Sequence, residues 1–98
     1  MPVRLRLSAA ARDDLRDIRN YSKSAFEAAV AAAYLAGLRR MFGTLRENPL
    51  AGPLARNARE GIRSIGYRSH RLYYRVDGEL LLVIRIIHHA RDAPRLIS

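Results

Sequence analysis

The sequence contains no cysteine, and its single lysine is Lys23. Without cysteine, the chain has no disulfide bond, no thiolate nucleophile and no cysteine-based zinc site. Its apolar runs fall short of the roughly 18 residues that a membrane-spanning helix needs, and its N-terminus lacks the apolar region of a signal peptide. We therefore expect a cytoplasmic protein without membrane contact.

Arginine supplies nearly all of the positive charge. The 98 residues carry 18 basic and 9 acidic side chains, which gives a formal net charge of +9. This excess favours a polyanionic or acidic partner, such as a nucleic acid, an enzyme that handles nucleic acid or an acidic protein. The plainer alternative is that the charge only keeps the protein soluble. At this length, and with 49% hydrophobic residues, we expect one domain over residues 1–98.

The C-terminal third has the pattern of a β-hairpin. Two strand-like runs, His70–Val76 and Leu80–His88, flank Asp77 and Gly78, and Asp-Gly is a strong signal for a tight turn. The second run is apolar except for Arg85 and its terminal histidine. Such a run is typical of a strand that is covered on both faces or lies in the middle of a sheet. We therefore predict that Leu80–His88 is a central strand.

The N-terminus predicts a strand followed by a helix. Val3–Leu7 alternates apolar and basic residues, as a half-buried strand does. Ser8 can then cap a helix over about residues 9–22. We expect its inward face to hold Ala11, Leu15 and Ile18 with Tyr21 or Ser22, and its charged residues, Asp14 among them, to lie mostly outside that face.

A second, longer helix is expected from a capping box at Ser24 and Glu27 to about residue 45, before Asn48-Pro49 ends it. Its apolar residues recur at spacings of three and four on one stripe, formed by Phe26, Val30, Ala33, Tyr34, Gly37, Leu38, Met41 and Leu45. The short connection between the two helices predicts an antiparallel αα-hairpin.

The element order is β-α-α-β-β-β. Residues 49–59 read as a loop, Gly61–Tyr67 as a weak strand, and residues 89–98 as an irregular C-terminal tail. One hairpin of helices can cover only one side of a sheet. We therefore predict an α+β fold in which the αα-hairpin packs on one face of a mostly antiparallel sheet.

Basic and aromatic residues interleave between positions 56 and 75. The arginines are Arg56, Arg59, Arg63, Arg68, Arg71 and Arg75, and guanidinium groups bind phosphate or carboxylate in a bidentate manner. Tyr67, Tyr73 and Tyr74 lie among them and could stack on bases. Since adjacent strand residues point to opposite faces, we expect one of Tyr73 and Tyr74 to belong to the core.

Three histidines are the candidate acid–base groups, because imidazole titrates near neutral pH. They are His70, His88 and His89, and a structural role at a strand end is the commoner alternative. Asp92 is the only further ligand nearby, so we expect no metal site. No Gly-rich phosphate loop or nucleophile elbow is present, and we expect no cofactor.

Several segments, taken together and in order, resemble ParE toxins of the RelE/ParE superfamily of bacterial type II toxin–antitoxin systems. They are the strand with Leu7–Ile18, Asn48-Pro49 with Gly52, Gly61–Arg63, Ser69–Val76, and Ile84–Asp92. The resemblance covers nearly the whole chain. It implies a RelE/ParE-like fold, an αα-hairpin on an antiparallel sheet.

The resemblance implies one of two activities. ParE-like members poison DNA gyrase, whereas RelE-like members are ribosome-dependent mRNA endonucleases. For a ribonuclease, the residues in matching positions would be Arg71 and His89. However, Ala90 stands where a related subgroup has tyrosine, and no glutamate precedes the strand at Gly61 at a position comparable to that in the ribonucleases. Lysine is absent from the whole sheet region, and the His-x-x-Arg-Asp ending is more similar to ParE. We therefore expect growth inhibition by a gyrase-binding toxin rather than by an enzyme.

Under the ParE interpretation, the basic sheet edge and the C-terminal segment would contact gyrase or its DNA complex. The candidate target-binding residues are Arg71, Arg75, Arg85, His88, Arg91 and Asp92. Arg85 lies within an apolar strand, so it is either a functional arginine facing a cavity or one paired with an acid, since an unpaired buried charge is too costly.

The resemblance also implies a ParD-like antitoxin, whose acidic and initially disordered tail would fold on the toxin as a helix and a strand in a hetero-oligomer. A groove beside the αα-hairpin and the free sheet edge would receive it, and the candidate contacts are Val3, Leu5, Leu7, Leu15, Ile18, Tyr34 and Leu38. Two other interpretations are a degenerate relative without toxicity and a module that binds DNA alone in a salt-dependent manner.

Overall fold

The computed structural model describes residues 2–56 and 58–89. The elements in chain order are β1 (Arg4–Leu7), α1 (Ala9–Ala25), α2 (Ala28–Glu47), β2 (Arg63–Tyr67), β3 (His70–Asp77) and β4 (Leu80–His88). The sheet order is β1-β4-β3-β2, with β1 parallel to β4 and the other pairs antiparallel. The predicted β-α-α-β-β-β order and the central position of β4 are therefore confirmed. No helix in the described ranges is long and apolar enough to cross a membrane.

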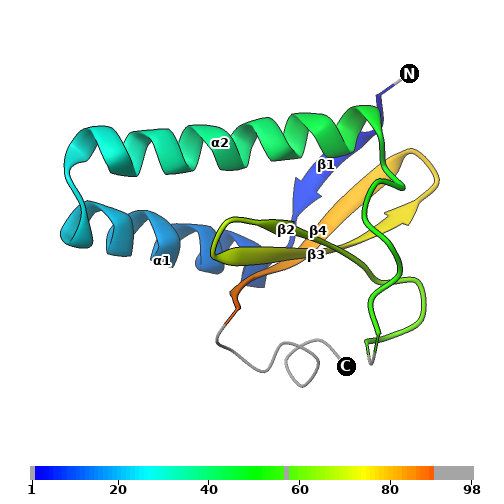
Figure 1. The fold of residues 1–98 in the computed structure, drawn as a ribbon. Coiled ribbons are helices and arrows are strands. Elements are labelled where there is room, and N and C mark those ends of the chain that lie inside the picture. Colours follow the sequence, from blue (N-terminus) through cyan, green and yellow to red (C-terminus); the bar gives the residue numbers. More distant parts are fainter. Residues whose placement is uncertain (1, 57, 90–98) are drawn as a thin grey trace.

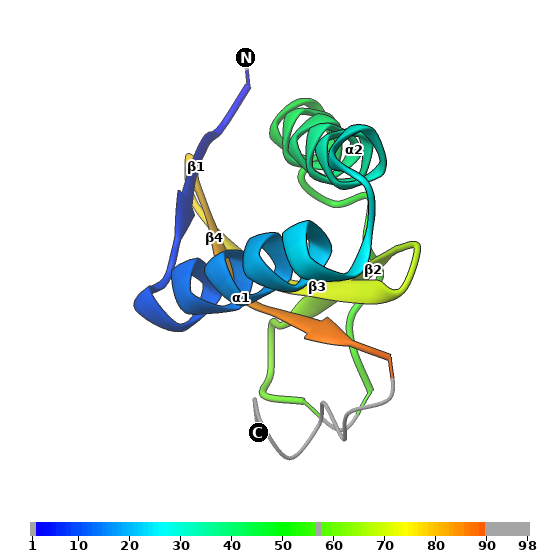
Figure 2. The same ribbon diagram turned by 90° about the vertical axis from the view of Figure 1, so that its left-hand side faces the viewer.

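Both helices lie on one face of the sheet, and the loop between α2 and β2 runs over the other (Figures 1 and 2). Figure 1 also shows that the far end of the αα-hairpin extends beyond the sheet. This overhang explains why part of the apolar stripe predicted for α2 is wrong. Phe26 and Val30 are 52% and 51% exposed, and Ala33 is exposed as well, because no strand lies beneath them.

The boundary between the helices also differs from the sequence prediction. Ser8 caps α1 as expected, and its hydroxyl accepts a hydrogen bond from the Ala11 amide at 2.9 Å. The capping box at Ser24 and Glu27 is wrong. Ser24 still belongs to α1, where its hydroxyl donates to the carbonyl of Tyr21, and Glu27 caps α2 without a side-chain hydrogen bond. A serine hydroxyl that bonds back to the preceding turn is not available to cap the next helix.

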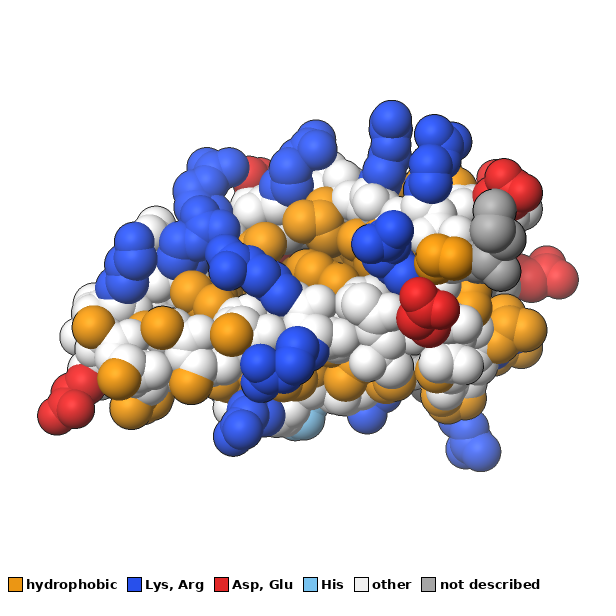
Figure 3. All heavy atoms as spheres, turned by 90° about the horizontal axis from the view of Figure 1, so that it is seen from above, with side chains coloured by type: hydrophobic (Ala, Val, Ile, Leu, Met, Phe, Trp, Pro, Cys, Tyr) orange, Lys and Arg blue, Asp and Glu red, His pale blue; other side chains and the backbone are white. Residues whose placement is uncertain are grey.

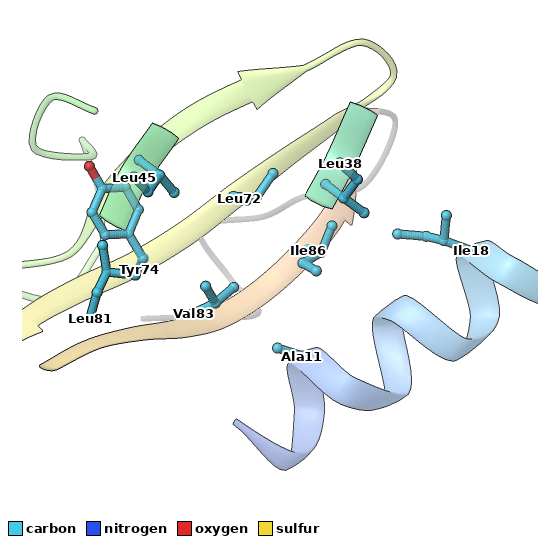
Figure 4. Close-up of a cluster of buried hydrophobic side chains, with 9 residues drawn as sticks. All are labelled: Ala11, Ile18, Leu38, Leu45, Leu72, Tyr74, Leu81, Val83 and Ile86. Atoms are coloured by element: carbon cyan, nitrogen blue, oxygen red, sulfur yellow. The ribbon is translucent and has the colours of Figure 1, made fainter. Parts of the chain in front are cut away.

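The main core lies between the helices and the sheet (Figure 4). Its buried side chains are Ala11, Ile18, Leu38, Leu45, Leu72, Tyr74, Leu81, Val83 and Ile86. The hydroxyl of Tyr74 accepts a hydrogen bond from the Gly52 amide at 2.8 Å, so the phenol is buried with its polar atom satisfied.

A smaller apolar cluster lies on the other face of the sheet. Ile62, Tyr73 and Ile87 are buried there, with Ala55 and Ala58 of the loop packed against them. The expectation that one of the two adjacent tyrosines is core is confirmed by Tyr74, and Tyr73 is buried as well. They point to opposite faces as the alternation of a strand requires, but the loop covers the second face and buries Tyr73 too.

The N-terminus of α1 is joined to the outer edge of β4. β1 pairs with β4 only as far as Val83. Beyond that point, the Ser8 hydroxyl donates to the Ile84 carbonyl at 2.7 Å, and an Asp14 carboxylate oxygen accepts from the Ile86 amide at 2.9 Å. Two side chains of the helix thus continue, on the edge of β4, the pairing that β1 no longer supplies.

Arg85 completes this junction. Its Nε and Nη2 donate to the two carboxylate oxygens of Asp14 at 2.7 and 2.9 Å, and the side chains are only 19% and 11% exposed. A register shift opposite Tyr73 and Tyr74 adds one residue to β4, and such a bulge re-aims the neighbouring side chain. The hydrogen bond with Asp14 raises the pKa of Arg85. We call these contacts of Ser8, Asp14 and Arg85 the edge clasp.

The edge clasp gives a stability prediction. Asp14→Ala leaves the Arg85 guanidinium and the Ile86 amide without their acceptor, so we expect the free energy of unfolding to fall by about 2–4 kcal/mol. Urea unfolding followed by circular dichroism measures it. The control is Asp13→Ala, which removes an exposed pair with Arg16 and should change stability by less than about 1 kcal/mol. Equal losses in the two variants would contradict the role of the clasp.

Two glycines of α2 give a second, matched pair. A Cβ at Gly43 meets nothing within 4 Å, whereas a Cβ at Gly37 would overlap the hydroxyl of Tyr67, which donates to the Tyr34 carbonyl. Gly43→Ala should therefore raise the free energy of unfolding by up to about 1 kcal/mol, and Gly37→Ala should lower it by about 1–2 kcal/mol. Thermal unfolding of both variants measures these changes in stability. Stabilisation by Gly37→Ala would contradict the prediction, because it would show that Tyr67 can move aside at no cost in free energy.

Candidate functional site

A groove of about 430 Å³ opens under the overhang of the αα-hairpin. It is lined from α1, the start of α2, the β2–β3 turn and the end of β4, by Asp14, Asp17, Ile18, Tyr21, Ser22, Phe26, Val30, Tyr34, Ser69, His70, Ile86, Ile87 and His88. We call it the hairpin groove. Tyr21, Phe26 and Val30 are at least half exposed in it, and the rings of Tyr21 and Phe26 meet edge to face at 6.2 Å. Exposed apolar side chains that gather in this way mark a surface that a partner covers.

Polar aromatic groups form the inner end of the hairpin groove. The Tyr34 hydroxyl and the His70 Nδ1 lie 2.6 Å apart, and the rings of His70 and His88 meet edge to face at 5.3 Å. Burial, followed by the charges of His88 and His89, lowers the pKa of His70. Burial likewise raises the pKa of Tyr34. At neutral pH the pair is therefore a hydrogen bond between two uncharged groups, which suits a mostly apolar partner.

The opposite face of the sheet carries the arginines of β3. Arg71 is half-buried, and its guanidinium donates to the hydroxyl of Ser64 at 3.0 Å. Arg75 lies four residues along the same strand, on the same face, and is exposed. Arg63 is held by the Gly52 carbonyl at 2.9 Å, so it supports the loop. This face therefore offers an exposed cation at Arg75 and a positioned one at Arg71.

The structure separates the candidate target-binding residues. Arg71 and Arg75 lie on the face away from the helices, whereas His88 lines the hairpin groove. Arg85 is bound in the edge clasp. Of the two alternatives that the sequence left open for Arg85, a cavity-facing arginine or one paired with an acid, the structure therefore shows the second. Arg91 and Asp92 lie outside the described residues.

The two ribonuclease candidates, Arg71 and His89, each bond to a different group. The amide of His89 donates to the Ser69 carbonyl at 2.9 Å, and its Nε2 lies 3.1 Å from the carbonyl of His70. Arg71 contacts the Ser64 hydroxyl instead. Within the described ranges, no three His, Asp or Glu residues are placed to hold a metal ion.

The candidate antitoxin contacts divide in the same way. Ile18 and Tyr34 line the hairpin groove. Val3, Leu5, Leu7 and Leu15 are half-buried at the rim of the main core. Leu38 is only 1% exposed, so its placement on a docking surface is wrong, because α2 directs it into the core.

Sequence reasoning did not select Tyr21, Phe26 and Val30 as partner contacts. The signal that could have found them is geometric. The second predicted helix, of about 21 residues, is roughly 31 Å long. A short sheet cannot cover its whole length, so the apolar side chains at its start had to face a surface other than the sheet.

Comparison with known proteins places the chain among toxins. Residues 5–93 match the family model described as "ParE toxin of type II toxin-antitoxin system, parDE". Toxin ParE1 of Caulobacter vibrioides is 35% identical over 88 residues, which cover 90% of this chain and 91% of that protein. Toxin ParE1 of Mycobacterium tuberculosis is 32% identical over 96 residues, which cover 97% and 98% of the two chains.

Solved structures agree on the fold. A chain of the chromosomal ParDE toxin–antitoxin system from P. aeruginosa aligns with a TM-score of 0.73 at 18% identity, over 88% of this chain and 95% of that one. A chain of the toxin–antitoxin complex RelBE2 from Mycobacterium tuberculosis aligns with a TM-score of 0.63 at 28% identity, over 91% and 100%. From the family model and the curated relatives together, this chain belongs to the ParE toxins of type II toxin–antitoxin systems.

Proposed function

We propose that this toxin acts by poisoning DNA gyrase and is neutralised by a ParD-like antitoxin. The observation that carries the proposal is the match of residues 5–93 to a family model described by parDE, with relatives named ParE1 at 32–35% identity over at least 90% of the chain. The toxin then works by binding its target, and the antitoxin works by covering the toxin.

The target-facing surface is the side of the sheet away from the helices. Arg75 is exposed there, and the Arg71 guanidinium is held by Ser64 with donors to spare. Guanidinium groups suit the phosphates of a gyrase–DNA complex or the carboxylates of gyrase itself. Arg85 contributes indirectly, because the edge clasp holds the end of β4 against α1.

The antitoxin is proposed to place an amphipathic helix in the hairpin groove. The groove presents Tyr21, Phe26 and Val30 at the overhang and Tyr34 at its inner end. A helix lays apolar side chains at three- and four-residue spacing into such a groove. The net charge of +9 attracts an acidic tail to the rest of the surface and speeds association.

Gyrase poisoning is tested with purified gyrase and supercoiled plasmid. We expect the folded toxin to cause cleaved plasmid to accumulate and its antitoxin to reverse the effect. Arg75→Glu should weaken this activity about tenfold, since it reverses a charge that faces the target, while Arg40→Glu on the helix side should not. If the folded toxin left gyrase unaffected but cut mRNA on ribosomes, and Arg71→Ala abolished that cutting, the RelE-like ribonuclease interpretation would replace this one.

The hairpin groove is tested by Val30→Glu. A carboxylate among Tyr21, Phe26 and Ile18 has to be desolvated when a helix covers the groove, so we expect antitoxin affinity to fall about 100-fold in calorimetry. Stability and gyrase poisoning should persist, because Val30 is half exposed. Ala32→Glu is the matched control on an exposed position of α2. Unchanged affinity of the Val30→Glu toxin would remove the hairpin groove from the antitoxin interface.

A further inference from the structure

Three apolar side chains of β4 form a strip on the far face of the sheet. Leu81 and Val83 point into the main core, so Leu80, Leu82 and Ile84 point away from the helices. These three side chains are half-buried. The smaller cluster beneath the loop reaches Ile84, whereas Leu80 and Leu82 belong to neither cluster of the described residues. We call the three side chains the β4 strip.

Arginines border the β4 strip on both sides. Leu82 is paired with Arg6 of β1 and with Arg75 of β3. The neighbouring Leu5 and Val76 pack on the main core, which places both arginines on the far face in one row with Leu82. Both are exposed, and neither takes part in the ion pairs found among the described residues. Since neighbouring strands lie about 4.8 Å apart, their Cα atoms are roughly 10 Å apart.

The next row along the strip holds an acid as well as a base. Leu80 is paired with Arg4 of β1 and with Asp77 of β3, and both charged residues are exposed. Because β1 is the outer strand of the described sheet, Arg4 and Arg6 also border a groove between β1 and α2. The β4 strip is therefore cationic beside Leu82 and nearly neutral beside Leu80, so an anionic partner should place its charges beside Leu82.

This part of β4 leaves no room for an added strand. Leu80–Val83 is paired with β1 on one side and with β3 on the other, so its backbone groups are used within the sheet. A partner must bind through side chains. Every fourth residue of a helix rises about 6 Å, and every second residue of a strand rises about 6.7 Å, so an apolar helical stripe matches the strip. A helix about 10–12 Å wide also spans the distance between the flanking arginines.

We infer that the β4 strip binds an amphipathic helix of the target protein that carries carboxylates on both flanks. The apolar residues of that helix pack on the strip, and its carboxylates pair with Arg6 and Arg75. Duplex DNA fits this surface less well. A phosphate above Leu82 would lose water without gaining a hydrogen-bond donor, which is costly.

This inference rests on the proposed function and narrows it. Arg75 can meet the phosphates of a gyrase–DNA complex or the carboxylates of gyrase itself, and the strip assigns it the carboxylates. Helix binding is measured with the toxin and a peptide alone. Failure of the peptide to bind and failure of the toxin to poison gyrase would therefore be seen in separate assays.

The probe is an alanine-rich helical peptide of about 18 residues, with leucines three and four residues apart on one face and glutamates on both flanks. Titrated into the whole toxin by calorimetry, it should bind at one site. The same peptide with glutamine in place of glutamate should bind at least about tenfold more weakly. Equal binding of the two peptides would overturn the inference. So would a short DNA duplex whose binding is weakened by Leu82→Ser when the peptide does not bind.

The test needs a control for net charge, because basic side chains also lie on the helix side. Figure 3, which looks down onto α2, shows them there. Arg40 of α2 is exposed, as Arg6 is. We expect Arg6→Glu to weaken peptide binding by at least about tenfold and Arg40→Glu to change it less than about twofold. Equal effects of the two variants would show that net charge alone attracts the peptide.

A second pair of variants locates the peptide, because the hairpin groove can also accept a helix. Leu82→Ser should weaken peptide binding about tenfold, since it removes apolar contact area, whereas Val30→Glu in the hairpin groove should leave binding unchanged. The reverse result would place the peptide in the hairpin groove and overturn the inference. Circular dichroism checks that every variant keeps the fold.

The unaltered toxin provides a readout that does not depend on any variant. In nuclear magnetic resonance, the methyl signals of Leu80, Leu82 and Ile84 should shift when the peptide binds, and those of Val30 should not. Binding that leaves the methyl signals of the β4 strip in place would rule out the strip as the docking surface.

Discussion

The edge clasp between α1 and β4 is the interaction on which the rest of the structure depends. One carboxylate, Asp14, accepts hydrogen bonds from both donors of the Arg85 fork and from the Ile86 amide. Together with Ser8, it joins the first helix to the free edge of the central strand. The clasp pairs an arginine that is almost buried, and it orients α1 so that Ile18 reaches the core. Both walls of the hairpin groove follow from that orientation, since Asp14, Ile18 and Ile86 line it.

The fold assigns different chemistry to its different sides. The helix side holds the mostly apolar hairpin groove and, between β1 and α2, a second groove lined by Arg4, Arg6, Arg39 and Arg46. The far side of the sheet holds Arg71 and Arg75 above a small core built by the loop. In the proposed mechanism, an antitoxin that wraps the helix side and a target that meets the other side use separate surfaces. The antitoxin would then neutralise the toxin either by excluding gyrase sterically or by extending around the sheet edge to cover the far face.

Much of the fold could be predicted from local pattern. The Asp77-Gly78 turn, the Ser8 cap and the apolar run of β4 have short-range causes, so the element order and the single helix-covered face followed from them. The misses have causes that are distant along the chain. Tyr73 is buried because the loop between α2 and β2 packs against that face of the sheet. Phe26 is exposed because the end of the αα-hairpin on which it lies extends beyond the strands. Neither neighbour can be read from the residues beside those positions.

The sequence by itself determined the α+β architecture and the excess of arginine, because these depend on periodicity, turn residues and composition. It also determined the family, through the similarity of its segments to those of ParE toxins. Only the tertiary structure decided what each arginine does. Arg85 is paired with Asp14, 71 residues away along the chain. Arg4, Arg6, Arg39 and Arg46 instead line one groove, and none of them forms an ion pair with an acid among the described residues. The physical reason is that the charge of a side chain follows from its residue type alone. Its pairing and burial depend instead on which elements the folded chain brings within a few ångströms of one another.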